Sequence, residues 1–89
     1  MVEFNVFPNP YSYETNIIYK LDTISAVRMD VIDVTGRIIY EFNEIPFRQD
    51  PGNYNYSFAP SELGLTKGMY IVRLMINDKV ITRKTSYVD

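Results

Sequence analysis

Cysteine and histidine are both missing from this chain of 89 residues. Without cysteine the chain cannot form a disulfide, a thiolate metal site or a thiol nucleophile. Without histidine it can hold neither a serine–histidine–aspartate triad nor a zinc ion bound by imidazole. The two absences argue against an enzyme, and we expect no catalytic residue, no cofactor and no metal ion.

Long apolar runs are missing too, and no segment approaches the roughly 20 residues that a membrane-spanning helix needs. The start of the chain lacks the basic region followed by an apolar stretch that marks a signal peptide. Met1 stands directly before the first strand-like segment. We therefore interpret residues 1–89 as a single domain taken from a longer secreted protein.

Charge is distributed unevenly along the chain, although its net value is only −2. Residues 1–62 hold nine acidic and four basic side chains, whereas residues 63–89 hold five basic and two acidic ones. This asymmetry can steer the C-terminal part toward an acidic partner. The same charges can also be solvated side chains that discourage aggregation at a strand edge. Because the chain is acidic overall and has no dense basic motif, we do not expect it to bind nucleic acid.

Short segments of alternating apolar and polar residues are separated by turn signals, which is typical of an all-β domain. Strands in so small a chain bury their faces only when they pack as two sheets. The sequence therefore predicts an immunoglobulin-like antiparallel β-sandwich of about seven strands. The cysteine pair and the tryptophan of antibody domains are absent, so the likeness is one of architecture. The expected strands are 2–7, 15–21, 26–34, 37–42, 53–58, 69–76 and 79–88.

Inward-facing positions of these strands define the expected core. Segment 69–76 is apolar on both faces apart from Arg73, which indicates a central strand covered on both sides. In segment 26–34, Arg28 and Asp30 are expected to point outward. The expected core residues are Phe4, Val6, Ile17, Tyr19, Leu21, Val27, Met29, Val31, Tyr56, Phe58, Leu65, Tyr70, Val72 and Leu74.

Turn residues fix several connections between the strands. Asp33 to Gly36 reads as a tight turn, and residues 60–63 read as one helical turn that begins with proline. The main loop is expected at residues 44–52. Broken alternation in 37–42 indicates a β-bulge. Residues 77–78 form a two-residue hairpin turn, since Asn and Asp tolerate positive φ.

That hairpin turn fixes the pairing of the last two strands. Counting outward from residues 77 and 78 sets Leu74 opposite Ile81 and Val72 opposite Arg83. This terminal hairpin is the most strand-like part of the sequence, although the end of a domain is usually its least constrained part.

Carboxylate side chains are candidates for an acid–base or calcium site. Asp30 and Asp33 lie three residues apart on a strand, so their side chains point to opposite faces. Glu41, Glu44 and Asp50 lack the dense spacing of a calcium loop. A carboxylate pair for hydrolysis is not excluded by spacing, but so small a sandwich leaves little room for a cleft.

Aromatic side chains form a second candidate site. They could build a platform on which a sugar stacks, or they could pack in the core and loops, which is the commoner role of such residues. The candidates are Tyr11, Tyr13, Tyr54, Tyr56 and Phe47.

Five motifs follow one another in a characteristic order. The first is Phe7-Pro8-Asn9-Pro10, where two prolines fix φ and remove two ladder donors. Strand-like segments 15–21 and 27–37 follow, and then Gly68-x-Tyr70 and Arg83-Lys84. This order resembles the C-terminal sorting domain (type A) of the type IX secretion system of Gram-negative bacteria. The resemblance runs from about Val6 to Val88.

The resemblance implies a function in protein export. Such a domain is an immunoglobulin-like β-sandwich that carries an attached upstream cargo protein across the outer membrane. Its partners are the type IX machinery and a sortase-like protease, which cuts the domain off and joins the cargo to lipopolysaccharide. The protein would pass through the periplasm and reach the outer membrane, the cell surface or the medium. The chain departs from many members by ending in Asp89 rather than in a basic residue.

The resemblance also implies recognition residues. Two of these residues, Gly36 and Gly68, are also explained by turn geometry, and Tyr70 is also explained as a buried core residue. Arg83 and Lys84 lie on the last strand, which could meet a partner by strand addition. The implied residues are Pro8, Asn9, Pro10, Gly36, Arg37, Gly68, Tyr70, Arg83 and Lys84.

The sequence is also compatible with other functions. The domain could be an immunoglobulin-like structural or adhesion module that is never cleaved, or a relative of flagellar hook-capping domains. A small hydrolase is disfavoured by the missing histidine and cysteine. Self-association is compatible with the sequence.

Overall fold

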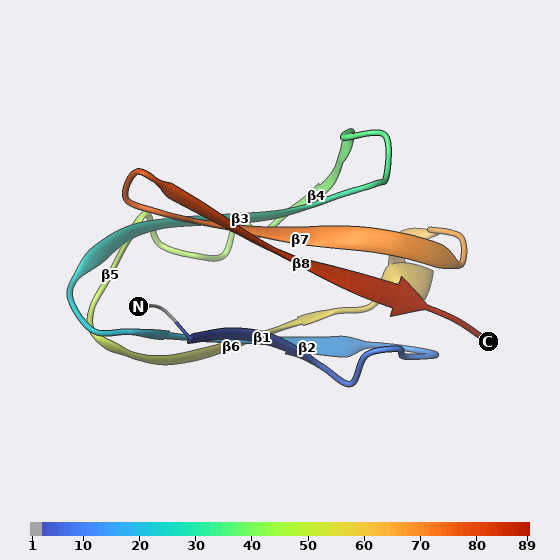
Figure 1. Ribbon diagram of the computed structural model, residues 1–89, viewed down its shortest axis with the longest axis horizontal. Helices are drawn as coiled ribbons and strands as arrows, with labels where there is room; N and C mark the ends of the chain where they lie inside the picture. The colour runs from blue at the N-terminus through green and yellow to red at the C-terminus, as the bar shows by residue number, and fades with distance from the viewer. Residues whose placement is uncertain (1–2) are drawn as a thin grey trace.

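Two antiparallel sheets pack face to face in the computed structural model, which describes residues 3–89 (Figure 1). The predicted β-sandwich is confirmed, while Val2 of the first expected strand lies outside the described residues. The smaller sheet has the order β1 (Glu3–Phe7), β2 (Thr15–Leu21) and β6 (Gly52–Phe58). The larger sheet has the order β4 (Ile38–Glu41), β3 (Ser25–Ile32), β7 (Gly68–Ile76) and β8 (Lys79–Tyr87), and β5 (Arg48–Gln49) also pairs with β3.

The chain crosses between the sheets at both ends of the sandwich. Residues 22–24 connect β2 to β3 at one end, and the segment after β6 returns to β7 at the other (Figure 1). This return contains the expected helical turn, a 3-10 helix over Pro60–Leu63. Gly64 ends the turn with a φ of 72°, a left-handed conformation that suits glycine.

Most of the expected core is buried between the sheets. Val6, Tyr56 and Leu65 are only partly buried and pack against the core from its rim. Five further side chains belong to the core and were not expected there, because they lie at strand ends or in connections. They are Tyr11, Phe42, Ile45, Ile76 and Tyr87.

The terminal hairpin has the predicted register. Leu74 pairs with Ile81 and Val72 pairs with Arg83. Asn77 adopts a φ of 54°, as the two-residue turn requires. β7 is thus held on one side by β3 and on the other by β8.

The prediction that β7 is covered on both faces is wrong. Its inward side chains, such as Val72 and Leu74, are fully buried, but Ile71 and Met75 on the other face are half-exposed. The reason is that β7 is central within its sheet, yet within residues 3–89 no third layer covers the outer face of that sheet.

The segment after β3 contains the expected irregularities. Asp33 to Gly36 forms the predicted turn. Val31 pairs with Tyr40 and Ile32 pairs with Ile38, so Ile39 is the extra residue of the predicted bulge. The expected loop over residues 44–52 contains the short strand β5, which brings Gln49 into the core.

Gln49 joins the two sheets through a polar contact inside the sandwich. The Tyr19 hydroxyl donates to Oε1 of Gln49 at 2.5 Å, and Nε2 of Gln49 donates to the Tyr56 hydroxyl at 2.9 Å. Burial raises the pKa of Tyr19, since it disfavours the charged phenolate. Every polar atom of this side chain therefore has a partner, as a buried amide requires.

Asp30 points outward from its strand, as predicted, yet its side chain is not exposed to solvent. It lies on the outer face of β3 but is 4% exposed, because Arg73 of β7 folds over it. Nε and Nη2 of Arg73 donate to the two carboxylate oxygens at 2.7 and 2.6 Å. The pair is bidentate, which is the strongest geometry for this interaction.

We predict that Asp30→Leu alone destabilises the domain by about 2–3 kcal/mol, since it leaves a partly buried guanidinium without a partner. The cost stays below that of a fully buried pair because the Arg73 side chain is 29% exposed. The double variant Asp30→Leu with Arg73→Met should recover to within about 1 kcal/mol of the wild type. Urea unfolding of the three proteins checks this, and a double variant less stable than the single one would contradict it.

Candidate recognition site

The Pro8-Asn9-Pro10 segment leaves β1 and lies along the outer edge of β8. Thr15 at the start of β2 is fully buried, and its hydroxyl donates to the carbonyl oxygen of Pro8 at 2.7 Å. Nδ2 of Asn9 donates to the carbonyl oxygen of Lys84 at 2.8 Å. The backbone N–H of Ser86 donates to Oδ1 of Asn9 at 2.9 Å. One side-chain amide thus pairs with two backbone groups of the edge strand.

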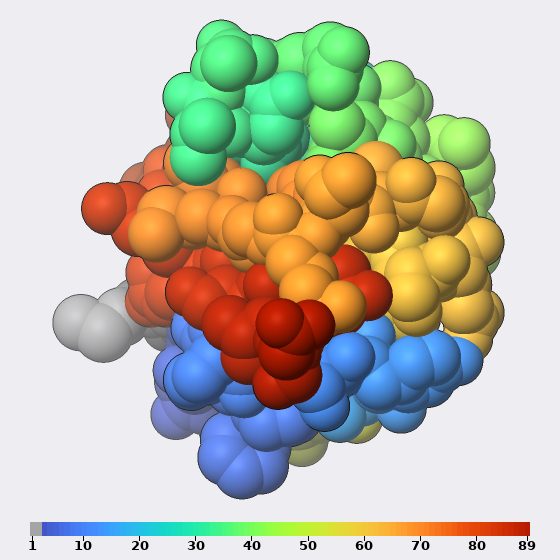
Figure 2. Space-filling view, turned by 90° about the vertical axis from the view of Figure 1, so that its right-hand side faces the viewer, coloured from blue at the N-terminus to red at the C-terminus, as the bar shows by residue number. Residues whose placement is uncertain are grey.

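Tyr11 continues this pairing along β8. Its N–H donates to the carbonyl oxygen of Ser86 at 3.0 Å, and the N–H of Val88 donates to the Tyr11 carbonyl oxygen at 2.8 Å. The Tyr11 and Tyr87 rings stack with centroids 5.8 Å apart. In Figure 2 the C-terminal end (red) lies against the blue N-terminal segment that contains these residues. We call Asn9 and Tyr11, together with the backbone groups of residues 84–88 that they bond, the edge clamp.

Buried hydroxyl groups lie beneath the edge clamp. The Tyr11 hydroxyl and Oγ1 of Thr85 are 3.1 Å apart, and Thr85 donates to the Tyr70 carbonyl oxygen at 3.3 Å. The Tyr70 hydroxyl donates to the carbonyl oxygen of Thr66. Burial raises the pKa of Tyr11. Tyr70 is therefore a core residue, and its ring is not available at the surface.

Arg83 closes the side of the sandwich between the edge strands β1 and β8. Its Nε donates to the Phe4 carbonyl oxygen at 3.0 Å, and its guanidinium carbon lies 5.2 Å from the centroid of the Phe4 ring. Its Nη1 donates to the Thr82 carbonyl oxygen at 2.9 Å. Lys84, the next residue, is exposed on the outer face of the larger sheet. The side chains of Arg83 and Lys84 thus lie on opposite faces of the larger sheet.

The last residue is also tied to the fold. Nζ of Lys67 lies 2.7 Å from Oδ1 of Asp89 and 5.6 Å from the centroid of the Tyr87 ring. Hydrogen bonding and charge attraction to Asp89 raise the pKa of Lys67. Asp89 therefore has a basic partner within the domain.

Gly36 and Arg37 lie in the turn between β3 and β4, outside the edge clamp. Oδ1 of Asp33 accepts hydrogen bonds from the Thr35 N–H, the Thr35 hydroxyl and the Arg37 N–H, at 2.6–3.0 Å. Gly36 has a φ of 91°, which a residue with a side chain rarely adopts. The hydrogen bonds from Thr35 and Arg37 lower the pKa of Asp33. Turn geometry thus gives both Gly36 and Asp33 a structural role.

Of the nine implied recognition residues, the fold brings five to the β8 edge: Pro8, Asn9, Pro10, Arg83 and Lys84. Gly68 pairs with Tyr87 at the same end of the hairpin. Tyr70 lies in the core below, and Gly36 and Arg37 lie apart. Tyr11, Ser86 and Val88 complete the edge clamp and were not expected there. Their contacts join residues more than 70 positions apart, and no local pattern reveals such contacts.

The aromatic platform is not formed. Tyr11 is 4% exposed and stacks on Tyr87, while Tyr54 and Tyr56 stack on Tyr19 at the edge of the core. Tyr13 and Phe47 are exposed, and among the described residues neither ring stacks on another aromatic ring.

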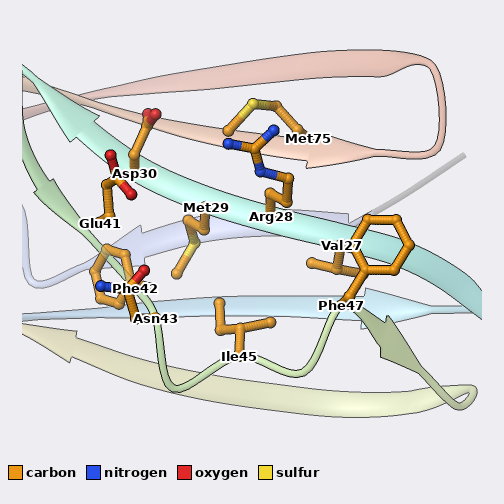
Figure 3. Close-up of a pocket in the computed structure, with 10 residues that line it drawn as sticks. All are labelled: Val27, Arg28, Met29, Asp30, Glu41, Phe42, Asn43, Ile45, Phe47 and Met75. Atoms are coloured by element: carbon orange, nitrogen blue, oxygen red, sulfur yellow. The ribbon is translucent and has the colours of Figure 1, made fainter.

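A shallow hollow of about 210 Å³ opens where the chain leaves β4 (Figure 3). Asp30 and Glu41 are cross-strand partners there, a carboxylate pair that the sequence spacing did not reveal. Both oxygens of Asp30 accept hydrogen bonds from Arg73, so this carboxylate is already committed to an ion pair. The wall below is apolar and includes Phe42 and Ile45. Arg28, Glu41 and Asn43 complete the polar part of the lining.

Two further features of the described residues bear on the class of protein. None of the helical segments within residues 3–89 has the length and hydropathy of a membrane-crossing helix. Over the same range, no group of three or more potential metal-ligating side chains comes together.

Fold and edge clamp together define a small β-sandwich module whose C-terminal strand is bound to its N-terminal segment. Residues 5–87 match the family described as the secretion system C-terminal sorting domain. The match covers nearly the whole chain, and the chain belongs to this family of type IX secretion sorting domains. Comparisons with curated proteins and with solved structures give no significant match.

We predict that Asn9→Ala weakens the edge clamp and lowers the free energy of unfolding by about 1 kcal/mol, because two exposed hydrogen bonds are lost. The amide of Ser86 should then exchange with solvent several-fold faster, while amides of β3 keep their protection. Hydrogen exchange measured by NMR checks this. Asn55→Ala is the matched control, since Asn55 is exposed on β6 far from β8. Equal exchange of Ser86 in both variants would contradict the proposed role of Asn9.

We predict that the Asp33 carboxyl titrates below its ordinary value of 3.8. A lowered pKa in the folded state means that the turn is fully stabilised above the ordinary pKa. This stabilisation is lost as the pH falls through the lowered value. NMR shifts of the Thr35 and Arg37 amides should follow this titration and lose it in Asp33→Asn. A titration midpoint at or above 3.8 would refute the assignment.

Proposed function

We propose that residues 1–89 form the sorting domain of a longer secreted protein and carry an upstream cargo through the periplasm to the type IX machinery. The sorting function itself follows from membership in the family. The machinery then recognises the folded sandwich mainly through its terminal hairpin, and the cargo follows to the cell surface.

The edge clamp is the observation that supports recognition of the folded domain. Asn9 and Tyr11, near the other end of the chain, bond to the outer edge of β8 in the folded domain. The implied recognition residues Pro8, Asn9, Pro10, Arg83 and Lys84 are therefore neighbours only after folding. A partner that reads this surface distinguishes a folded sorting domain from an unfolded one.

We further propose that a sortase-like protease removes the domain and joins the cargo to lipopolysaccharide. The location of β1 supports an accessible cleavage site before the sandwich. β1 is an edge strand, and its exposed Glu3 lies at the rim of the smaller sheet. Chain that precedes Glu3 can be cut without breaking a ladder between two central strands.

A reporter carrying a periplasmic signal peptide and this domain tests the proposal in a Gram-negative bacterium that has a type IX system. We expect the fusion at the cell surface, and we expect loss of surface display when residues 80–89 are deleted. Deletion removes the buried Thr85 and Tyr87 together with the hairpin. Protease shaving of intact cells measures display, and mass spectrometry of the surface reporter shows whether the domain has been cut off.

The reporter without the domain, and the fusion in a strain without a working type IX system, are the controls. Display that persists in either control would refute transport by this route. A displayed reporter that keeps residues 1–89 would refute cleavage alone and would favour a module that stays on the mature protein.

A further inference from the structure

The edge of β8 is divided into a closed half and an open half. Backbone groups on one side of an antiparallel edge strand point away from the sheet at every second residue. In β8 these residues are Val80, Thr82, Lys84 and Ser86, because Lys84 and Ser86 bond outward to the edge clamp. The closed half is the part that Asn9 and Tyr11 cover.

The open half lies between the hairpin turn and Lys84. Within residues 3–89, no hydrogen bond joins the outward N–H and C=O of Val80 or the N–H of Thr82 to another segment. Among the described residues, the Thr82 carbonyl oxygen accepts only from the neighbouring Arg83 side chain. Figure 1 shows this part of β8 at the hairpin end, where the strand stands away from the smaller sheet before it approaches β1. An edge with unpaired backbone groups is a template for another strand.

Side chains of the open half fit one kind of partner. Val80 is 61% exposed and Ile81 is half-buried, so an added strand would find apolar contacts on both faces. β8 carries Lys79, Arg83 and Lys84 and no acidic residue. A strand that pairs here with acidic side chains would gain cross-strand charge attraction. A second copy of β8 would instead bring like charges together, which disfavours self-pairing through this edge.

We propose that the open half of β8, from Lys79 to Arg83, is the docking edge to which an extended acidic segment of the type IX machinery adds as a strand. This inference rests on the proposed sorting function and gives it a specific mode of contact. The edge clamp sets the limit of the docking edge, because Asn9 occupies the Lys84 carbonyl oxygen and the Ser86 N–H. The partner strand therefore pairs with about five residues and not with the whole of β8.

Proline at position 82 tests the docking edge directly. The N–H of Thr82 points away from β7, so Thr82→Pro removes an outward donor and no bond of the β7–β8 ladder. Thr82→Val keeps the N–H and is the matched control. Surface display of the reporter fusion should fall about tenfold or more in Thr82→Pro, the effect of losing about one backbone hydrogen bond and the close approach it allows. Thr82→Val should be displayed like the wild type.

Folding and charge are tested separately. Circular dichroism and thermal unfolding show whether Thr82→Pro keeps the sandwich; if it does not, Val80→Pro replaces it, since the Val80 N–H also points outward. Lys79→Glu should reduce display, whereas Lys20→Glu on the exposed face of β2 should not. The described residues form a closed sandwich, so the isolated domain can be used for sedimentation. This measurement detects a dimer.

The outcomes separate the two proposals. A folded proline variant displayed as well as Thr82→Val would overturn the docking edge, although loss of display on deleting residues 80–89 would leave the sorting function intact. Failure of the wild-type fusion to reach the surface would overturn the sorting function itself. A wild-type dimer that Thr82→Pro converts to a monomer would show that the occupant is a second copy, and this too would overturn the inference.

Discussion

Two hydrogen bonds from one asparagine side chain hold the end of this domain in place. Asn9 lies 75 positions before Lys84 and 77 before Ser86, and its amide bonds to both. An asparagine amide offers a donor and an acceptor at nearly the spacing of a peptide group. It can therefore stand in for one residue of a missing strand. Aspartate, which only accepts, or lysine, which only donates, could satisfy one of these two groups but not both.

The remaining polar contacts show how a sandwich of 89 residues closes its open sides. A chain of this size buries only about 60–65% of its unfolded surface and has little stability in reserve. Arg83 spans the gap between β1 and β8 with its guanidinium over Phe4, and Gln49 connects Tyr19 to Tyr56 inside. Both contacts replace apolar packing that so few residues cannot supply. Arg73 covers Asp30 in the same way on the outer face of the larger sheet.

Features encoded within one or two neighbouring segments could be predicted from the sequence, whereas contacts between distant segments could not. Alternation and turn residues specified the strands, the Asn77 turn and the pairing of Leu74 with Ile81. Asp30 was placed correctly on the outer face of its strand, but its burial depends on Arg73 of another strand. The Pro8-Asn9-Pro10 motif and the terminal bases Arg83 and Lys84 are separate signals in the sequence. That Asn9 bonds to the strand of Lys84 depends on the path of the whole chain between them.

The same row of backbone groups on β8 bears on both solubility and recognition. An edge strand that stays open along its whole length invites aggregation, and one that is fully covered offers nothing to a partner. Here the edge clamp covers the C-terminal end of β8, while Lys79 and Arg83 in the open half disfavour pairing with a second copy of the strand. Positive charge disfavours pairing with another basic strand and favours pairing with an acidic one. The same basic side chains therefore protect the open half and select its partner. The closed half of β8 thus stabilises the C-terminus, and the open half near the hairpin turn selects the partner.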